Sequence, residues 1–469
     1  MKKEAVFIIL LSLLSFTPII MLPLPAEATP GIVRVPQDFL TIQQAIDATA
    51  SGGTILVAAK TYNENITVWK PLQIKGENAY STIIEQAGAF AICHVTANNV
   101  NISGFTLRGG SIGVWVDSCN YGSITSTVIT NNDDGMWVTF SYGAVVSKNT
   151  LTDNLFMGLY LEASNNTSID ANTIARNTYG TYIQNSEGNA IYSNNFSLNY
   201  ADGIDAINSN YNSVFHNMIS NNSLGIYLQG SNSNSIYENN LVYNLAQALV
   251  EGTITNGWDD GTHGNYWSNY TGLDSNNDGI GDTAQVINGN NQDRYPLMKP
   301  WANIAITAIT CSKTAVVQGQ ETNITAVVQN QGWDPLTTGV TLYANTTMLT
   351  SFTNIVLQSR SQVTLNFTWQ TASFGKAKYV INANANAVSG EPDTTDNTLI
   401  YAKKVAVTVA GDVNGDGVVD IYDAIALANA YSAVPTSQNW NANADINSDS
   451  IVDIYDAIIL ANNYGKKSW

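Results

Sequence analysis

The sequence contains few basic residues and few cysteines for its length. Its 469 residues include 19 Lys and Arg against 37 Asp and Glu, which gives a formal net charge of −18. A negative charge of this size repels nucleic acid and anionic membranes, so we expect neither as a partner. The three cysteines, Cys93, Cys119 and Cys311, leave at least one thiol unpaired and lack a metal-binding spacing such as Cys-x-x-Cys. Disulfide bonds are therefore at most a minor contribution to the fold.

Long hydrophobic runs are also scarce, and the chain has one at its start. This run extends from Ala5 to Leu24, follows Lys2-Lys3 and precedes the small-residue site Ala26-Glu-Ala28. The pattern is typical of a secretory signal peptide, which we place at residues 1–28. No later segment is long and apolar enough to span a bilayer. The sequence therefore predicts an exported protein, secreted or associated with the cell surface, with no membrane insertion after cleavage.

A repeat of 22 or 23 residues extends from about Ala89 to Asn244, and a repeat of this length indicates a solenoid. Each repeat has a glycine, two aliphatic or aromatic core residues and an asparagine whose amide can bond to buried turns. Short alternating strands and the lack of a helical period favour a right-handed parallel β-helix. The columns of glycine and asparagine are Gly113, Gly135, Gly158, Gly180, Gly203 and Gly225, and Asn132, Asn154, Asn177, Asn199, Asn222 and Asn244.

Both ends of the repeat region carry recognisable motifs. Thr41-Ile-Gln-Gln-Ala-Ile-Asp47 reads as a capping helix, and with Thr61-Tyr-Asn-Glu-Asn-Ile66 it resembles the opening of pectate-lyase-like right-handed β-helix proteins. The closing motifs Gly264–Gly272, Asp274–Asp282 and Asp293–Met298 look like those of the NosD-like family. The resemblance covers residues 31–300 and implies a single β-helix domain.

NosD-like proteins are tied by name to copper delivery. This sequence offers only His94, His216 and His263, which are scattered along the chain, and it has no cluster of Met or Cys. We therefore expect these histidines to be structural rather than copper ligands.

One outward-facing column of the predicted β-helix is rich in aromatic residues. Residues after each repeat glycine alternate between core and solvent, and adjacent coils lie about 4.8 Å apart, so side chains at one repeat position form a ladder. Sugar C–H faces pack on aromatic rings while sugar hydroxyls bond to polar side chains, which predicts binding of a polysaccharide or cell-surface glycan. The alternative is that the rings stack only to stabilise the sheet. The ladder is Trp115, Trp137, Tyr160, Tyr182, Asp205 and Tyr227, and the next column is Asp117, Thr139, Glu162, Gln184, Ile207 and Gln229.

The same face carries candidate catalytic carboxylates, Asp117, Glu162 and Asp205. Asp117 and Glu162 are expected two coils apart, about 9–10 Å, near the upper end of the range for inverting glycosidases. A lyase would need a Lys or Arg base, which this face lacks. If the protein is an enzyme, we expect a glycoside hydrolase or a polysaccharide lyase. The alternative is a non-catalytic adhesin or assembly component with a purely structural β-helix.

The repeat ends near residue 300, and residues 301–409 have a different pattern. Strand-like runs at Asn323–Val328, Val340–Tyr343 and Val363–Trp369 predict a small antiparallel sandwich. Together with Val328–Gly332 and Gly390–Asn397, they resemble the cell-adhesion-related CARDB module. The resemblance implies a spacer or a binding module.

The sequence ends with two copies of a loop followed by a helix. Oxygen ligands occur at loop positions 1, 3, 5, 9 and 12, with a main-chain carbonyl expected at position 7, and this set suits Ca²⁺. A single Asp-rich loop is usually a solvated turn, but two copies in matching register predict two bound calcium ions. The ligands are Asp412, Asn414, Asp416, Val418, Asp420 and Asp423 in the first loop, and Asp445, Asn447, Asp449, Ile451, Asp453 and Asp456 in the second.

A loop with only the exiting helix, in duplicate, resembles a type I dockerin over residues 410–465. The resemblance implies a cohesin-bearing partner, and the near-identity of the copies implies two equivalent partner faces, around Ile421-Tyr422 and Ile454-Tyr455. Position 6 is Gly417 in one loop and Ser450 in the other, where a left-handed backbone costs a residue with a side chain about 1–2 kcal/mol. We expect the second calcium to bind more weakly.

A third loop has part of the calcium pattern. Asp274, Asn276, Asp278 and Asp282 fall at ligand positions, but Gln285 supplies no carboxylate at position 12. A bound calcium ion and a plain Asx-turn loop both remain open at this position.

Overall fold

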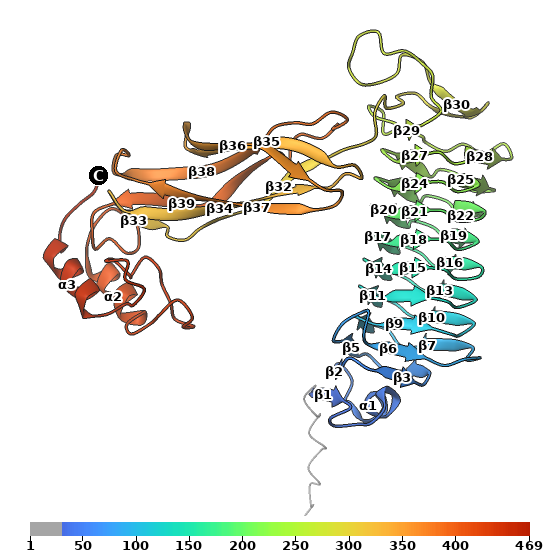
Figure 1. Ribbon diagram of the computed structural model, residues 1–469, viewed down its shortest axis with the longest axis horizontal. Helices are drawn as coiled ribbons and strands as arrows, with labels where there is room; N and C mark the ends of the chain where they lie inside the picture. The colour runs from blue at the N-terminus through green and yellow to red at the C-terminus, as the bar shows by residue number, and fades with distance from the viewer. Residues whose placement is uncertain (1–30) are drawn as a thin grey trace, which may run out of the picture.

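The computed structural model describes residues 31–469, so the predicted signal peptide lies outside the described residues. The chain forms a stack of β-coils, then a β-sandwich that leaves the C-terminal end of the stack, then a pair of short helices at the far end of the sandwich (Figure 1). No helix within residues 31–469 has the length and apolar character needed to cross a membrane.

The stack is a parallel β-helix, as predicted, and each coil contributes one strand to each of three sheets, A, B and C. Sheet A contains β1 Ile32–Val35, β2 Thr54–Val57, β5 Gln73–Gly76, β8 Asn101–Ser103, β11 Ser123–Thr125, β14 Val145–Ser147, β17 Ser168–Asp170, β20 Ala190–Tyr192, β23 Ser213–Phe215 and β26 Ser235–Tyr237. Sheet B contains β3 Thr61–Asn63, β6 Ile83–Glu85, β9 Thr106–Arg108, β12 Val128–Thr130, β15 Thr150–Thr152, β18 Thr173–Ala175, β21 Asn195–Ser197, β24 Met218–Ser220, β27 Asn240–Val242 and β29 Tyr266–Trp267. Sheet C contains β4 Ile66–Val68, β7 Ala91–Val95, β10 Ile112–Asp117, β13 Asp134–Thr139, β16 Met157–Glu162, β19 Tyr179–Gln184, β22 Asp202–Ile207, β25 Leu224–Gln229 and β28 Ala246–Glu251.

The coils stack in strict register, and their inward side chains form one continuous apolar core. Trp115 pairs with Trp137, which pairs with Tyr160, so residues one repeat apart lie next to each other. The glycine column is required by close approach of the chain, because a Cβ at Gly158 would lie 2.7 Å from the carbonyl oxygen of Gly180.

Side-chain amides at the corners satisfy the backbone inside the stack. Asn177 accepts a hydrogen bond from Asn154 N at 3.0 Å and donates from Nδ2 to Leu151 O at 3.0 Å and to Asn199 Oδ1 at 3.3 Å. Such ladders remove the cost of burying unpaired turn groups. Besides the predicted column, the structure contains two further asparagine columns and a serine column that the sequence analysis missed: Asn149, Asn172, Asn194, Asn217, Asn239 and Asn265; Asn189, Asn212, Asn234 and Asn256; and Ser141, Ser164, Ser186, Ser209 and Ser231.

Both ends of the stack are covered. At the start, helix α1 (Ile42–Ala48) is capped by Thr41, whose hydroxyl accepts from Gln44 N, and it buries Ile42 and Ile46 against the first coils. At the end, a closing segment with the hairpin β30 (Gln285–Asn288) and β31 (Asn291–Asp293) buries Trp258 and Trp267. The buried Asp293 carboxylate accepts from the Trp267 indole at 2.7 Å, and its burial raises its pKa to about 6.

The sandwich packs a three-stranded sheet on a five-stranded sheet around its own core. The predicted strand segments all lie within strands of this unit. The first sheet contains β32 Ile304–Cys311, β34 Glu321–Asn330 and β37 Gln362–Gln370, and the second contains β33 Ala315–Val317, β39 Thr398–Thr408, β38 Ala377–Ala385, β35 Leu336–Ala344 and β36 Thr347–Leu357.

The sandwich contacts the last coils of the β-helix through two tryptophans. Trp301 N donates to Asn240 Oδ1 at 2.7 Å, and the Trp301 ring stacks on His216 with 3.9 Å between ring centroids. The Trp333 indole donates to His216 O at 3.0 Å.

The C-terminal unit contains α2 (Ile421–Asn429) and α3 (Ile454–Asn463). Each helix begins with an aspartate capping box, formed by Asp420 with Asp423 and by Asp453 with Asp456. The end of the chain returns to the first loop, where Ser468 N donates to Gly417 O at 2.8 Å. The two loops and the helices therefore form one compact unit.

We predict that Asn177→Ala lowers the free energy of unfolding of the β-helix by about 3 kcal/mol. The substitution leaves Asn154 N, Leu151 O and Asn199 Oδ1 without this partner inside the stack, and each buried unpaired group costs about 1–3 kcal/mol. Chemical denaturation followed by circular dichroism measures the change. Gln229→Ala, at an exposed position of sheet C, is the control and should change stability by less than about 0.5 kcal/mol. Equal stability of the two variants would contradict the assignment.

Candidate functional site

The predicted aromatic ladder forms on sheet C. Register pairs Trp137 with Tyr160, Tyr160 with Tyr182, Tyr182 with Asp205 and Asp205 with Tyr227, and His94 continues the column beyond Trp115. The five predicted rings are all half-buried, so each one keeps part of its surface open to solvent. Sheet C lies on the side of the stack away from the sandwich (Figure 1), so the sandwich and the C-terminal helices do not cover the ladder.

The rings also contact one another. Trp115 meets Trp137 edge-on at 6.3 Å between centroids, and Trp137 meets Tyr160 edge-on at 5.5 Å. The Trp115 indole donates to Thr139 Oγ1 at 2.9 Å, and the Tyr160 hydroxyl donates to Gln184 Oε1 at 3.1 Å. The ladder and the polar column beside it therefore hold each other in place, which fits mutual stabilisation as well as ligand binding.

Further rings beside the entry to sheet C extend the ladder sideways and were not predicted from the sequence. Phe90, Phe156 and Tyr200 are exposed, and Tyr179, the first residue of β19, is half-buried. Phe90 contacts Trp115 edge-on at 5.7 Å, and Tyr179 contacts Tyr182 in the same way at 5.8 Å. Phe156 and Tyr200 are 51% and 77% exposed. Their sequence signal was their position one or two residues after the asparagine column, which places them beside the ladder.

Sheet A carries a different aromatic arrangement. Tyr192, Phe215 and Tyr237 stack face to face, with ring planes within 5° and centroids 5.1 and 5.4 Å apart. In this stack the ring faces cover one another. In sheet C the tryptophan contacts are edge-on, His94 stacks on Trp115, and the rings of both ladders are half-buried, so the two ladders differ in ring geometry.

The predicted carboxylates occupy separate positions on sheet C. Asp117 and Glu162 lie in the same column two coils apart, with Thr139 between them. Asp117 is held by Ser118 Oγ at 3.0 Å and lies 3.6 Å from His94 Nε2. Asp134, at the start of β13, accepts from Met157 N at 2.9 Å. The structure does not bring these groups together into one cluster.

Asp205 requires a correction, because it does not face open water as the alternation predicted. Its side chain is 3% exposed, and within the described chain its Oδ1 has no hydrogen-bond partner. Burial, together with the neighbouring Asp202 carboxyl, raises the pKa of Asp205 to about 7, and burial raises the pKa of Asp202 to about 6. The pair therefore holds a proton in the middle of the ladder near neutral pH, as a general acid must.

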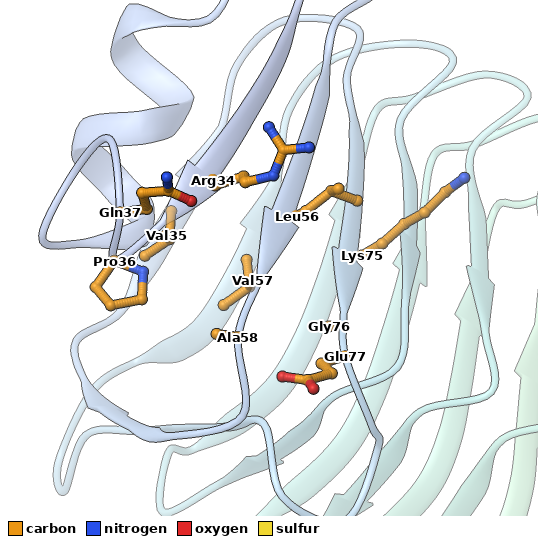
Figure 2. Close-up of a pocket in the computed structure, with 10 residues that line it drawn as sticks. All are labelled: Arg34, Val35, Pro36, Gln37, Leu56, Val57, Ala58, Lys75, Gly76 and Glu77. Atoms are coloured by element: carbon orange, nitrogen blue, oxygen red, sulfur yellow. The ribbon is translucent and has the colours of Figure 1, made fainter.

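A hollow of about 340 Å³ lies elsewhere, on the first coils of sheet A. Figure 2 shows Arg34, Leu56 and Lys75 on neighbouring strands at this hollow, with Glu77 at its other end. It includes no residue of the ladder or of the two C-terminal loops. Glu77 is the one carboxylate among its lining residues.

The two C-terminal loops have nearly identical internal geometry. In the first, Asp412 accepts from the backbone N–H groups of residues 415, 416 and 417, and Asp423 accepts from Val413 N at 2.8 Å and Asn414 N at 3.0 Å. In the second, Asp456 accepts from Ile446 N at 2.7 Å and Asn447 N at 3.1 Å. These bonds order each loop around its first and last aspartates, and the carboxylate and amide oxygens of the loop are the kind of ligand that Ca²⁺ prefers.

Position 6 of the loops differs in side chain but not in backbone. Gly417 has φ 99° and Ser450 has φ 73°, both left-handed. Ser450 therefore carries the strain expected from the sequence.

The loop at residues 274–282 repeats the same pattern on the closing segment. Asp274 accepts from Asp278 N at 3.1 Å and Gly279 N at 3.0 Å, as Asp412 does from residues 416 and 417. Asp282 accepts from Ser275 N at 2.9 Å and so closes the loop in place of the missing carboxylate at position 12. The oxygens at Asp274, Asn276, Asp278 and Asp282 are those that would hold an ion here.

The predicted partner residues lie on the outer faces of the two helices. Ile421 and Tyr422 begin α2, Ile454 and Tyr455 begin α3, and all four side chains are exposed. Ile425 and Ile458 extend each face by one turn. Two similar apolar faces are therefore presented on one small domain.

Comparison with known families agrees with this architecture. Residues 46–272 match the family described as periplasmic copper-binding protein (NosD), and residues 410–463 match the dockerin type I domain. The chain contains a NosD-like domain and a type I dockerin domain. Type I dockerins are calcium-binding modules that attach to cohesins, which agrees with the paired loops and exposed helix faces.

The similar proteins share only parts of this chain. A cell surface glycoprotein of Methanothermus fervidus is 31% identical over 134 residues, which is 28% of this chain and 21% of that protein. A CARDB domain of Pyrococcus furiosus, solved with di-metal ions, is 21% identical over 23% of this chain and 89% of its own, with a TM-score of 0.20. The DFA-IIIase of Arthrobacter chlorophenolicus A6, without its lid and with GF2, is 12% identical over 53% of this chain and 83% of its own, with a TM-score of 0.42. With identities of 21% and 12% and TM-scores of 0.20 and 0.42, the two solved structures support no conclusion about the function of this chain.

Soft copper ligands do not gather in the NosD-like domain. Cys93 and Cys119 are buried in the core, where burial raises their pKa to about 12 and about 11, so the thiols stay protonated. The histidines are less dispersed than the sequence suggested, because His216 and His263 both approach Glu238. His94, in contrast, stacks on Trp115 at 4.3 Å.

We predict that Asp205→Asn raises the thermal unfolding midpoint at pH 8 and leaves it unchanged near pH 4. The folded pKa of Asp205, about 7, lies above the ordinary carboxyl value of about 4, so folding costs more as pH rises through this interval and the carboxyl ionises. The neutral amide removes that cost.

Asp153→Asn is the opposite-sign control for this measurement. The Arg176 guanidinium holds the pKa of Asp153 below its usual range, so this substitution should lower the midpoint at pH 8. A pH-independent effect of Asp205→Asn would rule out the raised pKa.

Proposed function

We propose that this exported protein binds a polysaccharide or cell-surface glycan along sheet C and is fastened by its dockerin to a cohesin-bearing protein in a calcium-dependent way. The observation that carries the glycan proposal is the row of half-buried rings in register on an uncovered sheet. A linear glycan has apolar C–H faces that pack on such rings. The proposal takes the secreted or cell-surface location from the dockerin, which serves extracellular assemblies.

The polar column beside the rings supports this proposal. Glu162, Gln184 and Gln229 follow the ladder at the spacing of the coils and offer acceptors and donors for sugar hydroxyls. The exposed rings of Phe156 and Tyr200 widen the apolar strip on its other side. A strip with apolar and polar edges favours a chain of sugars over a small ligand.

For the dockerin we propose two calcium ions, and a third on the closing segment of the β-helix. Each C-terminal loop offers six oxygen ligands in its sequence, including one main-chain carbonyl, Val418 or Ile451. The loop at Asp274–Asp282 has the same carboxylate and amide arrangement with a different closing residue. The exposed pairs Ile421-Tyr422 and Ile454-Tyr455 would let a cohesin dock in either of two orientations.

A sharper form of the proposal is cleavage of the bound glycan. Asp205, with Asp202, would donate the proton to the leaving oxygen, and Glu162 or Asp117 would act as the base or nucleophile. The buried carboxyl in the middle of an aromatic strip supports this role for Asp205. The chemistry would then be that of a glycoside hydrolase. For a lyase, the face still lacks a Lys or Arg base.

The alternative function is a non-catalytic adhesin or assembly component, and the edge-on ring contacts favour it because they stabilise the sheet without a ligand. Incubation of the purified protein with a panel of polysaccharides separates the two functions. Assays of new reducing ends and of unsaturated products detect hydrolase and lyase action. Binding without either product favours the adhesin.

We predict that Trp115→Ala combined with Trp137→Ala reduces retention on an insoluble glycan about fivefold or more. The double substitution removes two adjacent rings of the strip, and each ring contact contributes about 0.5–1.5 kcal/mol. Retention is measured by affinity electrophoresis or a pull-down with the insoluble polysaccharide.

The matched control is Tyr121→Ala combined with Tyr142→Ala, which removes an edge-on pair with 5.8 Å between centroids outside sheet C. This control should bind like the unchanged protein. Thermal unfolding of both variants separates loss of binding from loss of fold. Equal retention by the tryptophan variant and the unchanged protein would eliminate the strip as the binding surface.

We predict that Ser450→Gly strengthens binding of the weaker calcium ion about fivefold or more, because glycine adopts the left-handed backbone of position 6 without the cost of about 1–2 kcal/mol. Isothermal titration of the calcium-free protein with Ca²⁺ measures this change. Ser448 is also left-handed, where the first loop has Gly415, so the same argument predicts that Ser448→Gly strengthens calcium binding by a similar factor. If both calcium affinities in Ser450→Gly equal those of the unchanged protein, backbone strain does not set the difference between the loops.

A further inference from the structure

Three ligand groups converge where the closing segment meets the last regular coils. Nδ1 of His263 lies 3.8 Å from Glu238 Oε1 and 4.0 Å from Asp260 Oδ2, and the three ligand atoms all lie within 4.8 Å of one another. The described residues contain one such group of His, Cys, Asp and Glu. It includes none of the residues of the calcium loops or of sheet C.

The stacking of coils creates this convergence. Glu238 occupies the corner between β26 and β27, and His216 occupies the same corner one coil earlier, so His216 N donates to Glu238 O at 3.1 Å. The closing segment replaces the next coil, and Glu238 N donates to Gly264 O at 2.7 Å. His263, which precedes Gly264, therefore lies beside Glu238, where a residue of the next coil would lie if the repeat continued.

The ligand groups are already oriented by their neighbours. His216 Nε2 lies 2.7 Å from Glu238 Oε2, which leaves Oε1 directed toward His263. Asp260 Oδ1 accepts from Thr262 N and His263 N, both at 2.7 Å, which leaves Oδ2 free on the side of the imidazole. Trp301 stacks on His216 and covers it. Hydrogen bonds that fix a carboxylate in this way are typical around bound metal ions.

We propose that Glu238, Asp260 and His263 form a binding site for a divalent transition-metal ion such as Zn²⁺, with His216 as a positioning residue and water in the fourth position. Ligands at about 2.0–2.1 Å from a tetrahedral ion lie about 3.4 Å apart. The two distances from His263 would have to close by about half an ångström, and the Glu238–Asp260 pair, within 4.8 Å, by up to about 1.4 Å. Rotation of the Glu238 and Asp260 side chains would do this, and the metal would replace Thr262 Oγ1, which lies 3.1 Å from His263 Nδ1.

The donor set separates this site from the calcium loops. Imidazole nitrogen is a ligand for zinc and similar ions, whereas Ca²⁺ takes six to eight oxygens. A bound ion would link the corner of the last regular coil to the closing segment and, through His216 and Trp301, to the start of the sandwich. The metal would therefore close the end of the β-helix and stiffen its junction with the sandwich.

Zinc binding to the full chain, kept in saturating Ca²⁺ to occupy the calcium loops, tests the proposal. Competition with a chromophoric zinc chelator should give one Zn²⁺ per chain. His263→Gln and Glu238→Gln should each weaken binding at least tenfold, and His216→Gln should weaken it less. Zn²⁺ should also raise the thermal unfolding midpoint of the unchanged protein but not that of His263→Gln.

His94→Gln is the matched control, since it removes a histidine near a carboxylate, Asp117, at a distance from this cluster. It should bind Zn²⁺ like the unchanged protein, and circular dichroism verifies that every variant folds. No Zn²⁺ bound in the presence of Ca²⁺, the same affinity in His263→Gln as in the unchanged protein, or an equal loss in His94→Gln would each overturn the proposal.

Discussion

The one-to-one register between successive coils is the constraint on which the rest of the β-helix depends. Parallel strand hydrogen bonds set the spacing, and buried amides such as those of Asn154 and Asn177 bond to the next coil and to the corner backbone. A shift of one residue would place apolar side chains outside and leave the amides without partners. Register therefore specifies the core and the surface columns together.

Register also explains why chemically similar side chains form columns, and it makes visible the positions where one residue type replaces another. In the ladder of sheet C, an aspartate replaces a ring at position 205, between Tyr182 and Tyr227. A buried carboxyl at this place destabilises the fold when it ionises, since burial raises its pKa. This burial separates Asp205 from Asp117 and Glu162, which are half-buried on the same face.

Much of the architecture could be predicted from the sequence, because the repeat and the loop motifs are local in the chain. The ladder from Trp115 to Tyr227 and the dockerin loops were predicted residue by residue. The burial of Asp205 was not predicted. Alternation along a strand predicts on which side of the sheet a side chain lies, but not whether neighbouring rings cover that side chain. The group of Glu238, Asp260 and His263 was missed for another reason. The closing segment breaks the repeat, so the spacing that predicts neighbours elsewhere gives no information there.

The two dockerin loops have different neighbours, and these contacts affect how the dockerin is oriented relative to the sandwich. The C-terminal tail lies on the first loop, with Trp469 close to Gly417. The second loop, which carries the strained Ser450, rests on the sandwich. Lys313 Nζ donates to Asp445 O at 2.7 Å and to Ser448 Oγ at 2.9 Å, and Gln320 Nε2 donates to Ile446 O at 2.9 Å.

These bonds restrain the backbone of the second loop, so part of the entropy cost of ordering this loop is met by its contacts with the sandwich. The contacts use the loops and leave the outer faces of α2 and α3 open, with Tyr422 and Tyr455 exposed. A dockerin on a flexible tether would let the β-helix turn freely relative to its anchor. A dockerin whose second loop is bonded to the sandwich instead has its orientation coupled to that of the sandwich.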